Sequence, residues 1–296
     1  MLDFRIDTFL TVCEYMNYTR AAEALCITQP AVSQHIRWLE NQYGVPLFRY
    51  TGHHLTLTPA GEALRRVAST MKQDALSLRR QLNLAEEAAG ALCFGATPTV
   101  STYLLPAPLA AYHKDHPGAP ITLRVSNTQR LCEMLDAGEI DFAIVEGYFY
   151  KGDYDALLCC HERYLPVCTP GYSFSAPPAR LTDLLREPLL VREQGSGSRE
   201  IIRRSLNRQN MDLEDFACKI EIGDMNVLKQ LLLQGCGIAF LYESAVRQEL
   251  NAGTLREISL EDFDESHDIA FLWRKGSVFA PQFRQLHRRF FPDAPA

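Results

Sequence analysis

The stretch AAEALCITQPAVSQHIRWLENQYGVPLFRYTGHHLTLTPAG, residues 21–61, decides how the rest of the chain is organised. Its apolar residues recur at helical spacing in two short segments, which predict helices over about 18–25 and 30–43. Thr28 is suited to cap the second helix, Pro30 to open it and Gly44 to end it. Two helices joined by so short a turn are typical of a helix-turn-helix, a motif that lays its second helix in the major groove of DNA.

The second predicted helix carries a row of polar side chains beside its apolar stripe. The row consists of Gln29, Ser33, Gln34 and Arg37. Glutamine can pair with adenine through two hydrogen bonds, serine can donate or accept, and arginine contacts guanine or phosphate. The same four residues taken alone also suit an ordinary solvated helix face. The wider pattern of the N-terminal segment favours the DNA contact.

The first 61 residues resemble the winged helix-turn-helix of the LysR-type transcriptional regulators. The matching residues are Phe9, Ala21, Ala22, Leu25, 29–33, Ile36, Leu39, Glu40, Gly44, Leu47, Phe48 and 57–61. The resemblance implies a cytoplasmic regulator, not an enzyme, that binds operator DNA as a homodimer or homotetramer and needs no metal or cofactor. It implies DNA contacts from Thr28, Gln29, Pro30, Ser33, Gln34, Arg37, Arg49 and His53.

The predicted wing departs from the family pattern. The family usually has arginines two and five residues after the Leu-Phe pair, where this chain has Tyr50 and His53, while Arg49 is displaced by one position. Histidine is charged only near or below its unperturbed pKa of about 6.5. We therefore predict that operator affinity rises between about pH 8 and about pH 6 through His53 or His54. Surface histidines without this role are the alternative, and a constant affinity at fixed salt would support it.

Length and composition are those of a globular protein with more than one domain. The chain has 296 residues, of which 47% are hydrophobic and 22% charged. No apolar run approaches the roughly 18 residues of a membrane span. The N-terminus carries Asp3 and Asp7 in place of a basic signal-peptide region, so we expect the protein to stay in the cytoplasm.

The net charge of −6 lies outside the N-terminal part of the chain. Residues 1–90 contain nine lysines and arginines and nine aspartates and glutamates, so this part is neutral. Non-specific attraction to DNA is therefore expected to be weak. Affinity would come from base contacts and from a dimer that doubles them.

Nine cysteines are present without a C-x-x-C pair, and reduced thiols are expected. Cys159, Cys160 and His161 are adjacent, which does not match the usual ligand spacing of zinc sites and favours packing at a strand end. None of the eight histidines lies in a G-x-S-x-G, H-E-x-x-H or P-loop motif, so no catalytic or metal-binding residue is predicted. A thiol-redox sensor, and an enzyme or solute-binding module with an accessory N-terminal domain, are the alternative functions.

Pro59 opens a predicted long helix that ends at Gly90. Apolar or small residues recur along it at alternating steps of four and three. These residues are Leu64, Ala68, Met71, Ala75, Leu78, Leu82, Ala85 and Ala89. The heptad repeat predicts pairing with a second copy of the chain, and packing on its own domain is the alternative. A homodimer would place two recognition helices in successive major grooves, about 34 Å apart.

From residue 91 onward, strands and helices alternate, which predicts an α/β fold. Strands are expected over 92–96, 121–125, 141–145, 157–160, 164–168, 189–192, 219–222, 237–241 and 269–273, and a helix over 99–113. The family resemblance implies a periplasmic-binding-protein-like effector domain of two Rossmann-like subdomains. The expected organisation is a winged helix-turn-helix (all-α with a β-wing) over 1–58, a linker helix over 59–90 and the effector domain over 91–296. Subdomain I would comprise about 91–161 and 267–296, and subdomain II about 162–266.

Open α/β sheets bind ligands beyond the carboxyl ends of their strands. The polar residues expected there are Thr97, Thr99, Ser101, Asn127, Thr128, Glu146, Gly195 and Ser196. Hydroxyl groups, glycines and free N–H groups at helix N-termini suit an anion, although helix capping alone would also explain them. Because these residues are expected to face one cleft, they predict that the protein binds a small, anionic effector there. Glu146 adds acidity, so either the ligand carries both signs of charge or Glu146 pairs with an arginine.

Overall fold

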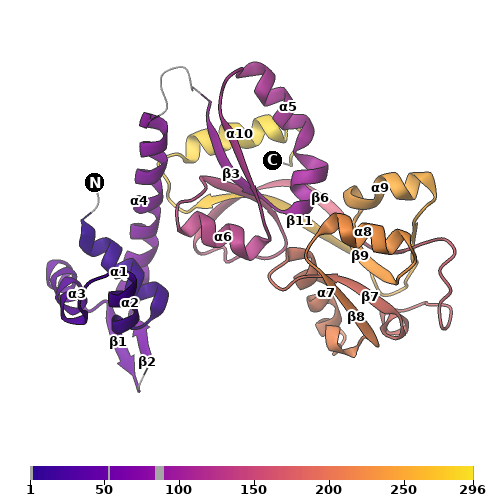
Figure 1. Cartoon of the computed structure of the whole chain (residues 1–296), viewed down its shortest axis with the longest axis horizontal. Helices are drawn as coiled ribbons and strands as arrows, with labels where there is room; N and C mark the ends of the chain where they lie inside the picture. The colour runs from indigo at the N-terminus through magenta and orange to yellow at the C-terminus, as the bar shows by residue number, and fades with distance from the viewer. Residues whose placement is uncertain (1–2, 53, 84–89, 296) are drawn as a thin grey trace.

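The computed structural model describes residues 3–52, 54–83 and 90–295. Figure 1 shows a small helical domain at the N-terminal end, a long helix that leads from it, and an elongated α/β part. His53, predicted to lie in the wing, and Ala85 and Ala89, predicted to extend the heptad repeat, lie outside the described residues. No helix in the three described ranges combines the length and hydrophobicity that crossing a bilayer requires.

The N-terminal domain is a winged helix-turn-helix, as predicted. Its elements are α1 (Phe4–Tyr15), α2 (Tyr18–Ala24), α3 (Gln29–Tyr43), β1 (Phe48–Thr51) and β2 (His54–Leu57). Phe9, Val32 and Ile36 are buried where the three helices meet. Thr28 caps α3 by accepting a hydrogen bond of 3.4 Å from the Ala31 N–H, and Gly44 ends the helix with a positive φ of 70°. Both predicted helix-terminal residues are thus confirmed.

The long helix α4 (Pro59–Asn83) presents different surfaces to its surroundings. Leu64 and Ala68 pack into the core of the N-terminal domain, so the prediction that they belong to a free seam is wrong. The polar side chains of Thr70, Gln73 and Ser77 are buried against the α/β part. A third, apolar surface is exposed and consists of Val67, Met71, Ala75, Leu78 and Leu82, which we call the apolar stripe of α4. The stripe shares Met71, Ala75, Leu78 and Leu82 with the predicted repeat.

One sheet of nine strands runs through the whole α/β part. The strand order is β4-β3-β5-β11-β6-β9-β7-β8, and β10 pairs with β6. The bounds are β3 (Leu92–Ala96), β4 (Ile121–Val125), β5 (Phe142–Glu146), β6 (Tyr154–Cys168), β7 (Pro188–Arg192), β8 (Cys218–Ile222), β9 (Ile238–Tyr242), β10 (Arg256–Glu257) and β11 (Glu265–Arg274). The strands predicted over 157–160 and 164–168 are one continuous strand, β6, because antiparallel pairing with β11 extends from Tyr154 to Tyr164.

The strands β6 and β11 connect two subdomains at opposite ends of the sheet (Figure 1). Subdomain I contains β3, β4 and β5 with α5 (Pro106–Asp115), α6 (Thr128–Asp136) and α10 (Ala280–Phe290). Subdomain II contains β7, β8 and β9 with α7 (Gly197–Arg208), α8 (Met225–Leu233) and α9 (Glu243–Ala252). All residues of β5 and β9 are buried, as is usual for strands covered on both faces.

The helix predicted over 99–113 is interrupted. A π-helical turn (Val100–Leu104) precedes α5, in which Pro106 occupies the first position. Proline has no N–H to donate to the preceding turn, so a regular helix cannot run through this residue. The interruption lies beside the carboxyl end of β3, where π-helical turns often accompany functional residues.

Candidate DNA interface and effector cleft

The first turns of α3 present the predicted DNA-contacting side chains to solvent. Gln29, Gln34 and Arg37 are exposed and Ser33 is half-buried, while the opposite face of the helix is buried in the core. The side-chain amide of Gln29 donates to the Ser33 hydroxyl over 3.0 Å. Thr28 and Pro30 are exposed at the N-terminal end of the same helix. These residues thus lie along the first turns of α3, from its N-terminal end to the middle of the helix.

Polar contacts fix α3 relative to its neighbours. The Thr8 hydroxyl of α1 lies 2.9 Å from Nδ1 of His35 on α3. The Glu40 carboxylate accepts from the Leu47 N–H over 2.8 Å, and the Thr58 hydroxyl donates to the Pro46 carbonyl over 2.7 Å. These contacts hold the recognition helix and the wing in a fixed orientation.

The wing is a two-stranded hairpin in which Arg49 of β1 lies opposite Thr56 of β2. Arg49 and Tyr50 are exposed. The role of the wing in DNA contact stays a prediction, and so does the role of His53, which the structure does not describe.

The second set of predicted residues meets where the two subdomains touch. Thr97, Thr99, Thr128, Glu146 and Ser196 are all buried. The Thr128 hydroxyl donates to the Glu146 carbonyl over 2.7 Å. Across the subdomain boundary, the Gln129 N–H at the start of α6 donates to the Gly195 carbonyl over 3.4 Å.

Two glycines allow the backbones of the subdomains to approach this closely. A Cβ atom on Gly197 would lie 2.3 Å from the carbonyl oxygen of Glu146, and a Cβ on Gly147 would lie 2.5 Å from Cα of Gly197. Both distances are shorter than any van der Waals contact. The segment after β5 and the start of α7 can therefore touch only because neither glycine has a side chain.

Several buried polar atoms in this region have no hydrogen-bond partner within the described part of the chain. They are Oγ1 of Thr97, Oγ1 of Thr99, Oε2 of Glu146, Nη1 of Arg192 and the Tyr242 hydroxyl. Leaving a buried polar group unpaired costs about 1–3 kcal/mol, and folded proteins rarely retain several together. A polar ligand or ordered water could supply the missing partners.

Glu146 is the most strongly perturbed group at this boundary. Burial raises its pKa to about 7, while the positive charge of Arg192 acts in the opposite direction. The charges of Glu193 and Glu162 raise it further. Glu146 can therefore carry a proton at neutral pH and donate it in a hydrogen bond.

A cavity of about 360 Å³ opens between the subdomains beside this buried group. Ser101 and Asn127 of subdomain I line one side, and Arg192 and the segment 223–226 of subdomain II line the other. Gly195, at the boundary itself, faces Asn127, whose amide lies 3.3 Å from the position of a Cβ. All eight predicted effector residues thus lie in or beside one cleft, although their contact with an effector stays a prediction.

Sequence reasoning missed Arg192, Tyr242 and the segment 223–226. Each lies at or just after the carboxyl end of a strand of subdomain II, which are β7, β9 and β8 respectively. The rule that selected the loops of subdomain I would have found them had it been applied to every strand of the second half.

The cysteines show few signs of redox chemistry. All nine are free thiols. Burial raises the pKa of Cys13 and of Cys132 to about 12 and that of Cys160 to about 11, which keeps them protonated at neutral pH. Cys159 is buried and Cys160 half-buried inside β6 (Tyr154–Cys168), so the two cysteines pack within a strand and the predicted position at a strand end is wrong. No group of three potential metal ligands occurs among the described side chains.

Two family models match the chain and together span most of its length. Residues 5–62 match the bacterial regulatory helix-turn-helix protein, lysR family, and residues 85–291 match the LysR substrate binding domain. The chain belongs to the LysR-type transcriptional regulators.

Curated relatives of this regulator are named as transcriptional regulators. An uncharacterized HTH-type transcriptional regulator, YeiE of Escherichia coli, is 29% identical over 256 residues, which are 86% of this chain and 85% of the relative. A RuBisCO operon transcriptional regulator of Allochromatium vinosum is 25% identical over 279 residues, which are 94% of this chain and 91% of the relative.

Solved structures show the same fold. Full-length LysG of Corynebacterium glutamicum with its bound effector Arg is 19% identical with a TM-score of 0.62, and the match covers 99% of both chains. CrgA of Neisseria meningitidis is 22% identical with a TM-score of 0.55, and the match covers 99% of this chain and 97% of that one. Both are LysR-type regulators by name.

Proposed function

We propose that this regulator binds operator DNA as a homo-oligomer and is switched by a small-molecule effector between its subdomains. The observation that carries the proposal is the group of unpaired polar atoms at the subdomain boundary. These atoms belong to both subdomains, so a ligand that pairs with them changes the free energy of closure. Because α4 lies against subdomain I and also packs on the DNA-binding domain, closure can alter the spacing of two DNA-binding domains in an oligomer.

The apolar stripe of α4 supports the oligomer. Val67, Met71, Leu78 and Leu82 are about half exposed or more. They follow one another at steps of four, seven and four residues, which places them along one side of the helix. In a paired arrangement they would be covered by the same residues of a second copy, and two copies of α3 could reach successive major grooves.

The proposed effector is anionic and small. Arg192 is buried and both its Nε and Nη2 atoms donate to Glu193, whereas Nη1 has no partner among the described residues. Nη1 would donate to a carboxylate or another oxyanion of the effector. The protonated form of Glu146 and the hydroxyls of Thr97 and Thr99 would supply further donors, so the nearby acid does not exclude an anion.

A thermal-shift screen of small organic acids against the full chain tests the proposal. A ligand at a hundredfold excess over its Kd stabilises the folded state by about 2.7 kcal/mol. We expect an effector to stabilise the wild type and to lose most of this effect in Arg192→Gln. Arg247→Gln, an exposed substitution on α9, is the matched control. An effector whose stabilisation is unchanged by Arg192→Gln would contradict the assigned site.

Binding to DNA has its own test. A labelled fragment of the region upstream of the gene should be retarded by the wild-type protein, and the effector should change its Kd. A protein that binds this fragment no better than unrelated DNA of the same length, at one salt concentration, would contradict operator recognition.

A further inference from the structure

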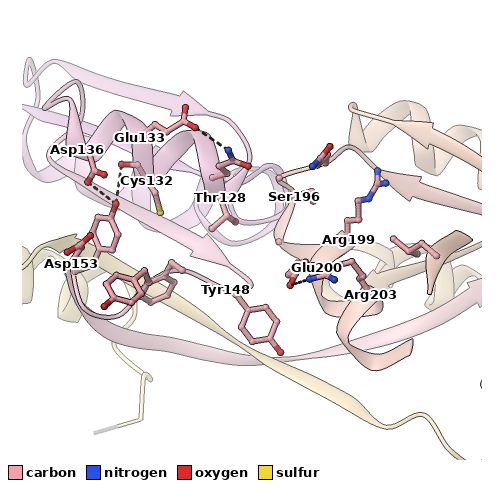
Figure 2. Close-up of a pocket in the computed structure, with 18 of the residues that line it drawn as sticks. Thr128, Cys132, Glu133, Asp136, Tyr148, Asp153, Ser196, Arg199, Glu200 and Arg203 are labelled. Carbon is pink, nitrogen blue, oxygen red and sulfur yellow. Dashed lines mark hydrogen bonds and ion pairs between the residues drawn. The ribbon is translucent and has the colours of Figure 1, made fainter. Parts of the chain in front are cut away.

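A larger cavity lies beyond the point where Gly195 meets the start of α6. Its volume is about 830 Å³, and it is lined by α6, the segment 148–154 and the first half of α7 (Figure 2). One end reaches Thr128 and Ser196 of the effector cleft. The far end is formed by Asp136, Asp153 and Tyr154. Figure 2 shows Asp136 and Asp153 near each other and away from Ser196. None of the residues that line this cavity also lines the 360 Å³ cavity.

The cavity carries an excess of negative charge. Its walls include six carboxylates and two guanidinium groups. Both guanidinium groups already have carboxylate partners, since Arg199 pairs with Glu221 and Arg203 with Glu200. The two carboxylates at the far end are paired with arginines from outside the lining, Asp153 with Arg65 and Asp136 with Arg274.

Asp153 is the incompletely paired group at that end. Only 8% of the residue is exposed. Its Oδ2 atom accepts from Arg65 over 3.2 Å, whereas Oδ1 is buried and has no hydrogen-bond partner within the described ranges. A buried carboxylate oxygen without a donor is unfavourable, so the far end can gain a hydrogen bond by binding a ligand.

Asp136 is the second acidic group at this end of the cavity. Asp136 accepts from the Tyr154 hydroxyl over 2.8 Å and from Arg274 over 2.7 Å, so this carboxylate already has hydrogen-bond donors. Burial raises the pKa of Asp136, Arg274 and the Tyr154 hydroxyl act in the opposite direction, and the charge of Asp153 raises it by a smaller amount. Phe149 and the exposed Tyr150 provide aromatic surface beside the two acids.

We propose that the far end of this cavity is a second ligand site, distinct from the effector cleft, that takes an organic cation. A primary ammonium group would donate to Oδ1 of Asp153, and the carbon chain of the ligand would lie against Phe149 and Tyr150. This site does not depend on the identity of the effector in the cleft.

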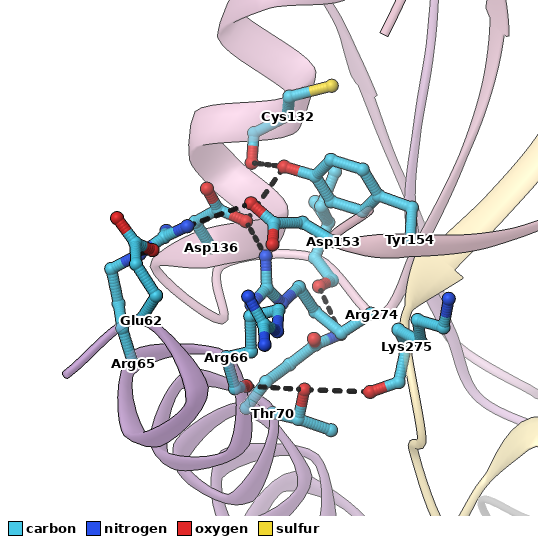
Figure 3. Close-up of polar contacts among 12 residues, drawn as sticks. Glu62, Arg65, Arg66, Thr70, Cys132, Asp136, Asp153, Tyr154, Arg274 and Lys275 are labelled. Carbon is cyan, nitrogen blue, oxygen red and sulfur yellow. Dashed lines mark hydrogen bonds and ion pairs between the residues drawn. The ribbon is translucent and has the colours of Figure 1, made fainter. Parts of the chain in front are cut away.

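The site is connected to α4 because Arg65 and the ligand share one carboxylate. Figure 3 shows Arg65 reaching from α4 to Asp153, beside the contact between Thr70 and the Lys275 carbonyl, which measures 3.0 Å. A second cation on Asp153 repels Arg65 and competes for the same negative charge. The bound ligand therefore weakens one of the contacts that hold α4 to subdomain I. By the same thermodynamic linkage, Arg65 lowers the affinity of the site for the ligand.

The test uses agmatine as the probe, with 4-guanidinobutanoate as its matched control. The two compounds share a guanidinium group and a similar chain, but the second replaces the ammonium group by a carboxylate. Affinity for the full chain is measured by calorimetry for the wild type, Asp153→Asn, Arg65→Gln and Glu146→Gln. Arg247→Gln controls for the loss of one exposed arginine.

Opposite effects of two substitutions are expected. Asp153→Asn should lower the affinity for agmatine at least tenfold. Arg65→Gln should raise this affinity severalfold, because a competing cation is removed while the carboxylate stays. If the ion pair had a purely structural role, both substitutions would change the affinity for agmatine in the same direction. Arg65→Gln also keeps the test decisive if Asp153→Asn fails to fold.

Three results would overturn the proposal. The first is no agmatine binding at millimolar concentration in either the wild type or Arg65→Gln. The second is equal binding of 4-guanidinobutanoate, which would remove the preference for cations. The third is binding that is lost in Glu146→Gln and kept in Asp153→Asn, which would place the probe in the effector cleft.

Discussion

The side-chain amide of Gln73 on α4 donates to the backbone oxygen of Asp141 in subdomain I over 3.0 Å, and only 1% of Gln73 is exposed. Ser77 and Arg80, one and two helical turns further on, both contact the carboxylate of Asp141. The polar side of the long helix therefore faces its own chain. The apolar stripe faces solvent instead, which is the reverse of an ordinary amphipathic helix on a globular domain.

This reversal predicts that the apolar stripe is a subunit contact. Leu78, of which 48% is exposed, would be buried against a second copy of α4. We expect Leu78→Glu to shift the protein from dimer to monomer at micromolar concentration, because it buries a charge in the contact. Analytical ultracentrifugation measures this shift. Arg79→Glu, on the adjacent exposed residue, is the control, and an unchanged dimer in Leu78→Glu would refute the assignment.

The row on α3 predicts a loss of operator affinity when Gln29 is shortened. Its amide contacts Ser33, and if it pairs with a base as proposed, Gln29→Ala should cost about 1–3 kcal/mol of binding free energy. Gel-shift titration at fixed salt measures the change. Gln42→Ala, on an exposed residue near the other end of α3, should bind like the wild type. Equal affinities of the two variants would argue against base contact by Gln29.

The close approach of the subdomains predicts that Gly197 tolerates no side chain. Gly197→Ala brings a Cβ against the Glu146 carbonyl, which is backbone and cannot turn away, so we expect a destabilisation of about 1–3 kcal/mol. Gly223 serves as the control, because a Cβ atom there would meet no heavy atom within 4 Å, and Gly223→Ala should change stability by less than about 0.5 kcal/mol. Urea denaturation measures the free energy of unfolding of both variants. Similar transition midpoints would show that the boundary between the subdomains is not tightly packed.

The raised pKa of Glu146 predicts a dependence of stability on pH. The folded-state pKa is about 7, above the ordinary value of 4.5, so the folded protein binds more protons than the unfolded chain between these values. This group's contribution is therefore fully present below about pH 4.5 and is lost as the pH rises through about 7, by up to about 3 kcal/mol. Glu146→Gln should remove this loss, whereas Glu133→Gln on the exposed side of α6 should keep it. Unfolding free energies between pH 5 and pH 8 that fall equally in both variants would exclude Glu146 as the cause.

Much of the fold follows from local features of the sequence. Thr28 and Gly44 set the ends of α3 through the geometry of a cap and a positive φ, which need no distant partner. The buried strands β5 and β9 are indicated by nearly unbroken apolar runs. By contrast, the sequence pattern predicts two strands where the structure has only β6, because the central residues of β6 are polar. These residues belong to the strand because they pair with β11, some hundred residues later in the chain.

The candidate cleft could be predicted only in part. Thr97, Thr99, Asn127 and Thr128 follow strands of subdomain I, so their position beyond the sheet follows from the βα alternation. The same rule places Arg192 at the end of β7, but its unpaired Nη1 becomes apparent only when the surrounding atoms are known. The cavity beside Asp153 has no sequence signal, since its surroundings come from α4, α6, α7 and the segment 148–154.

The sequence by itself determined the helix-turn-helix, the long helix and the βα alternation, because capping, periodicity and turn chemistry act between residues close in the chain. Tertiary structure alone decided which side of α4 is free. Leu64 and Ala68 have the same apolar character as Met71 and Leu78, yet the first pair is covered by the N-terminal domain and the second is not. Burial depends on where distant segments pack, and the spacing of apolar residues along one helix does not contain that information.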